Sequence, residues 1–199
     1  MTQPRRARYH HGDLKAELVR SAIELIGERG VTGFSMAQLT RRLGVAPSAP
    51  YAHFADRDAL LAAVVVHGYQ VFHAELAPEL ATVSAPRDRI AAMARAYVRF
   101  AAAHDALFDV LYHAGVDKVA HPSVAEAERP ITDAFAGCVT ALGGDDRLAT
   151  AVEATAHGYA MLLRGGDFDG YDSAVREAAD GAARAVLALV DGWGQLRCR

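Results

Sequence analysis

Apolar residues recur at helical spacing along almost the whole chain. In the first segment, four of them share one helical face at four-residue intervals, namely Leu14, Leu18, Ala22 and Ile26. Asp13 is suited to cap this helix, and Gly30 can adopt the left-handed conformation that ends it, so we expect a helix over about residues 13–29. Because no alternating strand pattern occurs anywhere, the chain is predicted to be all-α.

Two short helices joined by a tight turn are predicted next. Ser35 and Gln38 have the spacing of a capping box, in which each side chain bonds to the backbone amide of the other, so the second helix should begin at Ser35. Gly44 then ends it, since glycine adopts a positive φ without strain. A third helix is expected from Pro47 to about Phe54, because proline is favoured at the first position of a helix.

The remaining residues predict a body of longer helices. Asp56 is suited to cap a fourth helix, and Pro78 is expected to close it. Further helical patterns cover about residues 87–104, 105–113, 123–142, 147–164 and 173–193. We therefore expect an N-terminal three-helix domain over residues 1–57, with a basic arm over residues 1–11, and a C-terminal helical domain over residues 58–199.

The charge of the chain is divided unevenly between these two parts. Residues 1–57 hold nine Lys and Arg against five Asp and Glu, whereas the remainder holds twelve against nineteen. A basic end on an acidic body fits a nucleic-acid partner that is contacted at one end only, although a solvated basic face is the commoner explanation of such a surface.

Composition also indicates where the protein works. The chain has 199 residues, of which 52% are hydrophobic, enough to build a real core. No uncharged run of 18 apolar residues occurs and no apolar stretch follows the basic start, so we expect a cytoplasmic protein with no membrane partner. The two cysteines, Cys138 and Cys198, form neither a metal-binding pair nor a disulfide framework.

A short helix, a glycine-containing turn and a second short helix form the helix-turn-helix arrangement, in which the second helix enters the major groove of DNA. Small side chains from Ala46 to Ala49 allow a close approach to base edges, and Ser48 can form a hydrogen bond there. The residues expected to contact bases or phosphates are Ser35, Arg41, Arg42, Ala46, Pro47, Ser48, Tyr51, His53 and Arg57. Arg5, Arg6 and Arg8 of the arm are candidates for further phosphate or minor-groove contacts. The same shape also occurs in helical proteins that never bind DNA.

Three motifs within residues 32–61 narrow this choice. They are Phe34-Ser35, Leu43-Gly44-Val45 and Tyr51-Ala52-His53-Phe54, and they are followed by the capped start of the fourth helix. Together they closely resemble the amino-terminal domain of the TetR family of transcriptional regulators, from about Tyr9 to Phe72. The resemblance implies that Tyr51 and His53 contact phosphates, as does Arg57 in place of the usual lysine, and that Ala46 to Ser48 face the bases.

The resemblance also implies that the body binds a small effector and dimerises. It implies a homodimer through about residues 147–164 and 173–193, where small or apolar residues recur at Ala151, Ala154, Gly158, Met161, Ala178, Ala182, Ala185 and Leu189. These stripes could instead pack within one chain. The body is similar to members that carry a Trp-x-x-x-His-Gly pattern, although Glu153 stands at the tryptophan position before His157-Gly158.

An effector pocket is expected among the middle helices, for an apolar or aromatic compound that remains unidentified. Its candidate lining residues are Tyr97, Phe100, Phe108, Tyr112, His113, Phe135, His157 and Met161, most of which also suit an ordinary core. By the resemblance, such a ligand favours a conformation that no longer fits a palindromic operator. The resemblance also implies a repressor, the commoner mode in the family, with an activator as the alternative, since no residue decides between them.

Other classes of function fit less well. The sequence contains no nucleophile elbow, phosphate-binding glycine loop, His-Glu-x-x-His or Cys-x-x-Cys motif, so we expect neither an enzyme nor a cofactor. Nine histidines leave a metal-responsive regulator open, but no pair has the one-turn spacing of a helical metal site. The Asp167–Asp172 segment does not match a calcium loop, because its glycine falls at the fourth position. A helical adaptor that binds another protein is the remaining alternative.

Overall fold

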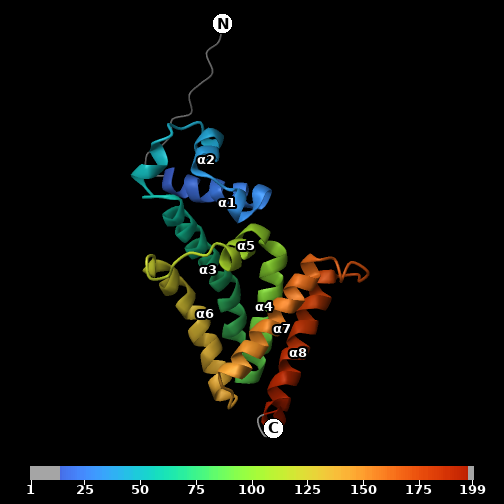
Figure 1. The fold of residues 1–199 in the computed structure, drawn as a ribbon. Helices are drawn as coiled ribbons and strands as arrows, with labels where there is room; N and C mark the ends of the chain where they lie inside the picture. The colour runs from blue at the N-terminus through green and yellow to red at the C-terminus, as the bar shows by residue number, and fades with distance from the viewer. Residues whose placement is uncertain (1–13, 197–199) are drawn as a thin grey trace.

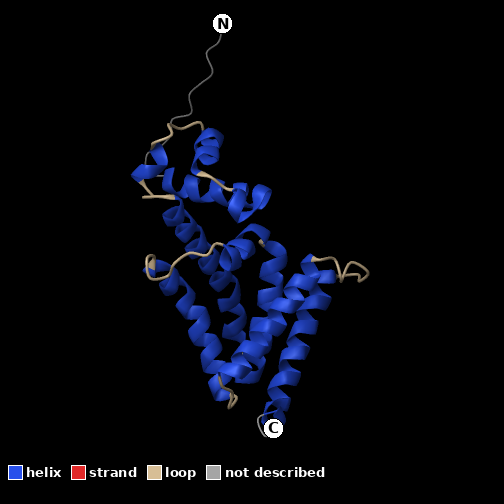
Figure 2. Cartoon of the chain, viewed as in Figure 1, coloured by secondary structure: helices blue, strands red, loops and turns tan. Residues whose placement is uncertain are grey.

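The computed structural model describes residues 14–196, which form α-helices and one 3-10 helix without any strand (Figure 1 and Figure 2). In order, the elements are α1 (Leu14–Gly33), α2 (Met36–Leu43), η1 (Ala49–Ala52), α3 (Arg57–Thr82), α4 (Pro86–Ala103), α5 (Asp105–His113), α6 (Pro122–Ala141), α7 (Asp146–Arg164) and α8 (Ala174–Leu196). The all-α prediction is confirmed. The proposed cap Asp13, the basic arm and Cys198 lie outside the described residues.

The helices α1 and α2 and the 3-10 helix η1 gather at one end of the molecule, and α3 runs from there into the body (Figure 1). Helix α1 is interrupted at Gly30, where φ is 72° and ψ is 168°, so its regular part ends where the sequence predicts. Leu18, Phe34 and Leu39 are buried between the elements of this end. Their burial holds α1 and α2 in a fixed relation to the start of α3.

Two expected features of the helices are wrong. The third helix is only the four-residue η1 instead of a run over residues 47–54, because Pro47 and Pro50 have no amide hydrogen to donate to a longer helical ladder. Pro78 does not close α3, which continues to Thr82. Since Pro78 is exposed, water can bond to the carbonyl group that the proline leaves without a donor.

The body is built around α4, which packs against α3, α7 and α8. Ile90, Val98 and Phe100 of α4 are fully buried, and α8 meets this helix with a face of small residues that includes Ala178 and Ala182. Helix α6 meets α7 at the Gly143–Gly144 loop and diverges from it toward α5 (Figure 1). The divergence leaves the wall of the body least complete between α6 and α7.

Helix α3 is long and apolar enough to cross a membrane, with 26 residues and a hydropathy of 1.3 in its most apolar window. However, 44% of that window is buried inside the protein. Its buried residues include Leu60, Leu61 and Val64, and the helix contacts α1, α4, α5 and α6. These contacts are those of a core helix.

Candidate nucleic-acid interface and ligand cavity

The start of α2 is fixed by the predicted capping box. The backbone amide of Ser35 donates to Oε1 of Gln38 at 2.9 Å, and the amide of Gln38 donates to Oγ of Ser35 at 3.4 Å. Gly44 ends the helix with φ of 64°, and its amide donates to the carbonyl oxygen of Arg41 at 3.3 Å. The turn toward η1 is therefore determined by local hydrogen bonds at both ends of α2.

Beyond the turn, the chain presents a surface of small and uncharged side chains. Ala46, Pro47 and Ser48 are exposed, and Tyr51 is 55% exposed. Pro50 is buried on the opposite side, where it anchors η1 to the domain. The surface can approach a DNA groove closely because residues 46–48 carry only short side chains.

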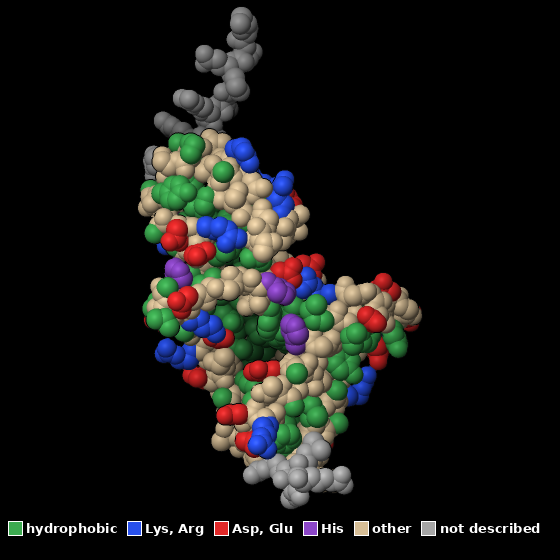
Figure 3. Space-filling view, in the orientation of Figure 1, with side chains coloured by type: hydrophobic (Ala, Val, Ile, Leu, Met, Phe, Trp, Pro, Cys, Tyr) green, Lys and Arg blue, Asp and Glu red, His purple; other side chains and the backbone are tan. Residues whose placement is uncertain are grey.

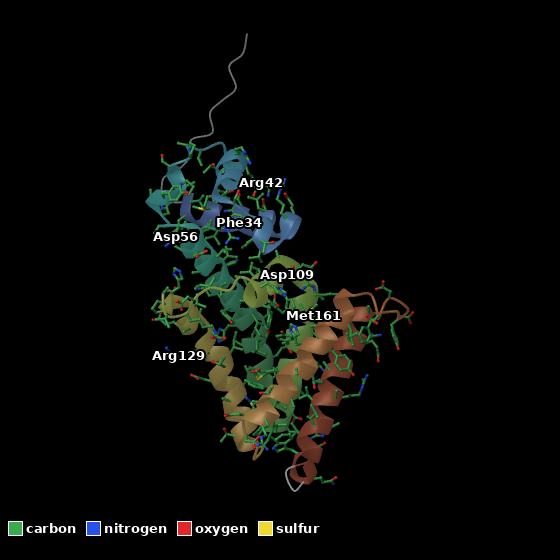
Figure 4. The ribbon with its side chains drawn as sticks, in the orientation of Figure 1. Phe34, Arg42, Asp56, Asp109, Arg129 and Met161 are labelled. Atoms are coloured by element: carbon green, nitrogen blue, oxygen red, sulfur yellow. The ribbon has the colours of Figure 1, made fainter. Side chains whose placement is uncertain are left out.

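The two arginines of α2 that were predicted to contact DNA differ in whether their side chains already have partners within the protein. Arg41 is exposed, whereas Arg42 forms ion pairs with Glu28 and, at 3.6 Å, with Glu24 of α1. Figure 4 labels Arg42 on α2. To reach a phosphate, Arg42 must leave these partners, whereas Arg41 need not.

Arg57 is turned toward the protein backbone. Its Nε donates to the carbonyl oxygen of Phe34 at 3.2 Å, and Nη2 donates to that of Val31 at 2.5 Å. The guanidinium carbon lies 5.6 Å from the centroid of the Phe34 ring. Arg57 therefore ties the start of α3 to the loop before α2. It can contact DNA only through the N–H groups of its guanidinium that do not bond to these carbonyl oxygens.

A cavity of about 600 Å³ opens into the body between α3, α4, α5, α6 and α7. Figure 3 shows it as a hollow whose floor is hydrophobic and whose rim carries acidic, basic and histidine side chains. The lining is mostly apolar and aromatic, and includes Phe72, Ile90, Met93, Phe100, Phe108, Leu111, Ile131 and Phe135. This volume and this lining are typical of sites for small organic molecules.

Six of the eight predicted pocket residues line this cavity: Tyr97, Phe100, Phe108, Tyr112, Phe135 and His157. His113 and Met161 do not. Nδ1 of His113 lies 3.2 Å from the carbonyl oxygen of Asp109, and the side chain is exposed. Met161 is 43% exposed and lies near the α5 end of α7 (Figure 4). Both residues were predicted from the approximate positions of the helices. Helical spacing shows which residues share a face, but it does not show which neighbouring helix that face meets.

Two polar groups inside the cavity, those of Tyr97 and His157, are paired with each other. The hydroxyl of Tyr97 and Nδ1 of His157 form a hydrogen bond of 2.9 Å. Burial disfavours the charged form of each group, so it raises the pKa of the acidic Tyr97 hydroxyl and lowers the pKa of the basic His157 imidazole. The charges of His113 and Arg164 lower the pKa of His157 further. Both groups are therefore held neutral, and together they offer a ligand a hydrogen-bonding pair that carries no charge.

Glutamates were missed by the sequence prediction. Glu128 of α6 accepts a hydrogen bond from the Tyr69 hydroxyl at 3.0 Å and forms an ion pair with Lys118. Glu153 of α7 lines the same cavity, and its pKa is raised by burial and then by the charge of Glu128. The one available signal was the presence of Glu153 at a position where a large apolar residue was expected.

A second, shallower groove of about 800 Å³ lies between α6 and α7. It shares Thr132, Phe135 and Glu153 with the cavity and adds Asp145 and Asp146. We take the aromatic cavity as the candidate binding site, because it is more enclosed than the groove and its lining is more strongly apolar and aromatic. The shared residues make Glu153 part of the boundary between the two.

Helix α5 connects the cavity with the DNA-facing end of the molecule. Phe108 and Tyr112 form part of the cavity wall, while Ala106 lies so close to Gly27 of α1 that a Cβ atom on this glycine would be 3.5 Å from its methyl group. Arg164 of α7 holds the same helix, through Asp105 at 3.3 Å and Asp109 at 2.7 Å. A shift of α5 would therefore change its contacts with both α1 and α7.

Part of the predicted dimer interface is instead buried within the chain. Ala178 and Ala182 are fully buried within the chain, because α8 uses this face to pack against α4 and α7. Other apolar residues of these helices stay open to solvent: Met161 and Leu162 are 43% and 47% exposed, and Val175 is 38% exposed. Ala154 is exposed as well, and Ala151, Gly158, Ala185 and Leu189 are half-buried.

No group of three His, Cys, Asp or Glu side chains within residues 14–196 is arranged to hold a metal ion. The loop between α7 and α8, including residues 167–172, forms turns and carries mostly exposed side chains.

Comparison with known proteins matches both parts of the chain. The family model described as bacterial regulatory proteins, tetR family, matches residues 18–64, and the one described as tetracyclin repressor-like, C-terminal domain, matches residues 90–190. The HTH-type transcriptional regulator BetI of Brucella anthropi is 32% identical over 79 residues, which span 40% of this chain and 41% of BetI. The match thus covers about two fifths of the length of that relative.

Solved structures extend the similarity over most of the chain. A protein with unknown function from Rhodococcus sp. RHA1 is 34% identical with a TM-score of 0.71, covering 92% of this chain and 98% of the other. FadR from Bacillus subtilis, in complex with stearoyl-CoA, has a TM-score of 0.67 at 16% identity and covers 88% of this chain and 96% of the other. The likeness to FadR concerns the fold alone.

Proposed function

Because the chain belongs to the TetR family of bacterial transcriptional regulators, we propose that it binds a palindromic operator as a homodimer and releases it when a small molecule fills the cavity. The observation that carries the proposal is the pairing of a capped helix-turn-helix with an aromatic cavity, joined by α5. Repression is the proposed mode, because the matching C-terminal family model is described as tetracyclin repressor-like. A ligand that shifts α5 would change the spacing of the two reading elements and so release the operator.

In the proposed complex, η1 lies in the major groove with residues 46–48 toward the bases. Tyr51 and His53 donate to phosphates on either side, and Ser35 and Arg41 add contacts from α2. Arg42 joins them after leaving Glu28, and Arg57 contributes chiefly by holding α3 in register with the loop before α2. The basic arm, which lies outside the described residues, is proposed to add affinity without sequence selectivity.

The homodimer is proposed to use the exposed parts of α7 and α8. Met161, Leu162 and Val175 form its apolar centre. Four-helix packing of this kind places two identical domains about a two-fold axis, which matches an operator with two half-sites.

The ligand is proposed to act through α5. A molecule that fills the cavity must contact Phe108 and Tyr112, which belong to this helix, and the helix in turn contacts α1 at Gly27. An acyl-coenzyme A such as FadR binds would bring several negative charges to a cavity whose one lysine, Lys118, is already paired with Glu128. The charges of this cavity therefore argue against that class of ligand.

The test is binding of the purified protein to DNA flanking its own gene, titrated across salt and repeated with Tyr51→Ala and His53→Ala. We expect selective binding, with a plot of the logarithm of the binding constant against the logarithm of salt concentration that has a slope of roughly −0.9 per phosphate contact. Both variants should bind every DNA sequence more weakly, by a similar factor for each sequence. Glu126→Gln, a change on the exposed face of α6, serves as the control. Absence of selective binding, in a genome-wide selection as well as at this DNA, would contradict the proposal.

A further inference from the structure

The cavity has an excess of negative charge that its neighbours do not neutralise. Its lining contains two carboxylates, Glu128 and Glu153, and one cation, Lys118. Lys118 is paired with Glu128, whose other oxygen accepts from Tyr69. Within residues 14–196, the Glu153 side chain forms neither a hydrogen bond nor an ion pair, so its charge at the rim of the cavity has no counter-charge.

Other cations close to the cavity do not change this balance. Arg164 lies over the Phe108 ring, 5.0 Å from its centroid, but it is bound to Asp105 and Asp109 and is not part of the lining. His157 lines the cavity as a neutral imidazole, because burial lowers its pKa. No other Lys, Arg or His side chain lines the described cavity.

The walls near these carboxylates are aromatic. Tyr69, Tyr97 and Tyr112 line the cavity together with Phe72 and Phe135. The Tyr97 ring lies 6.1 Å from that of Tyr112 and 6.0 Å from that of Phe72, in edge-to-face arrangements. Aromatic faces attract an organic cation, and they attract it more strongly where water is excluded.

We infer that the cavity recognises a hydrophobic organic cation, with its charged nitrogen beside Glu153 and its apolar part among the aromatic rings of α3, α4 and α5. The inference rests on the proposed function, since it names the class of effector for the same cavity. An ammonium group supplies the partner that Glu153 lacks, and it reduces the repulsion between Glu153 and Glu128. A carboxylate or phosphate at this place would add a third negative charge.

This assignment predicts an order of affinity for ligands of similar size. Three probes share a phenyl ring and a four-carbon chain: 4-phenylbutylamine, 4-phenylbutan-1-ol and 4-phenylbutyrate. Their binding to the full-length protein is measured by calorimetry without DNA, at about pH 8, where the amine is protonated and carboxylates are ionised. We expect the amine to bind about tenfold more tightly than the alcohol and the carboxylate to bind more weakly than both, as for one charge pair of about 1.4 kcal/mol.

Variants identify the residue responsible. Glu153→Gln should reduce the preference for amine over alcohol to about twofold or less and leave the affinity for the alcohol nearly unchanged, since the side chain keeps its size. Glu153→Lys should make the carboxylate the preferred probe. Glu126→Gln, an exposed glutamate of α6 outside the cavity, should change nothing. Because Glu153 is on the rim of the cavity and exposed, these variants are expected to fold.

Several outcomes would overturn the inference: equal affinity for amine and alcohol, preference for the carboxylate, no binding of any probe at millimolar concentration, or an amine affinity unchanged in Glu153→Gln. Operator binding is measured separately on the same preparation. A protein that binds DNA selectively but prefers the carboxylate contradicts the inference alone. A protein that prefers the amine but binds no DNA contradicts the proposed function alone.

Discussion

Arg57 joins the start of α3 to the loop that precedes α2. Its two hydrogen bonds reach the carbonyl groups of Val31 and Phe34, and its guanidinium lies over the Phe34 ring. Arginine is suited to this position because its planar group presents several donors at fixed angles. A single side chain therefore couples the helix-turn-helix to the helix that enters the body.

Replacement of Arg57 by alanine is expected to lower the free energy of unfolding by about 1–3 kcal/mol, because two carbonyl groups lose a charged donor. Arg57→Lys should be destabilised to a similar extent, since lysine cannot reproduce both bonds. The measurement is urea unfolding followed by circular dichroism. Arg41→Ala is the matched control, because the Arg41 side chain is exposed and forms no hydrogen bond or ion pair within residues 14–196. Full stability in Arg57→Ala would show that the residue acts on DNA alone.

At the scale of elements, the close approach of α7 and α8 depends on the absence of a side chain at Gly181. A Cβ atom at this buried glycine would lie 2.6 Å from Cε1 of Tyr159 and 3.3 Å from its Cζ. The Tyr159 ring in turn lies 6.2 Å from the ring of Phe168, in the loop after α7. The pair α7 and α8 is thus packed without room for one more methyl group at this point.

Gly181→Ala is therefore expected to destabilise the protein by about 1–2 kcal/mol, even though alanine is the better helix former. Gly137→Ala in α6 is the counterpart, since a Cβ atom there meets nothing within 4 Å. That change should raise stability by about 0.5–1 kcal/mol, through the helical preference alone. Thermal unfolding of both variants tests this pair, and the same sign for both changes would contradict the account of α7 and α8.

At the scale of the whole molecule, large exposed apolar side chains gather at one end of α7 and the start of α8. Met161, Leu162, Tyr171 and Val175 are each more than a third exposed. Solvent-exposed apolar patches of this kind mark protein interfaces. Met161, Leu162 and Val175 lie on the same two helices whose other faces close the body, and Tyr171 lies in the loop between them, so one pair of helices serves both the core and the proposed dimer.

Leu162→Asp is expected to convert the dimer into a monomer, because it would place a carboxylate in the apolar centre of the proposed interface. Operator affinity should fall by at least about a hundredfold, since two half-sites are no longer bound together. Light scattering coupled to size-exclusion chromatography measures the first effect, and DNA titration the second. Val119→Asp, at a residue 88% exposed in the loop before α6, should leave both unchanged. A Leu162→Asp protein that remains dimeric would place the interface elsewhere.

The sequence by itself determined the features that depend on neighbours along the chain. The capping box of Ser35 and Gln38, the positive φ of Gly44 and the cap at Asp56 follow from local chemistry, and the structure has each of them. Helical periodicity likewise predicted α4 to α8 to within a few residues. Local rules were insufficient at Pro78, where the helix continues because the proline lies on its solvent-exposed side.

Only the tertiary structure decided which residues meet across helices. Six of eight expected pocket residues line the cavity, but periodicity could not tell that Met161 faces outward or that Ala178 faces α4, because a stripe of small residues fits either a core or an interface. Glu128 and Glu153 stand 25 positions apart on different helices. Their shared cavity, and the excess of charge within it, arises from the divergence of α6 and α7, which no pattern along the chain encodes.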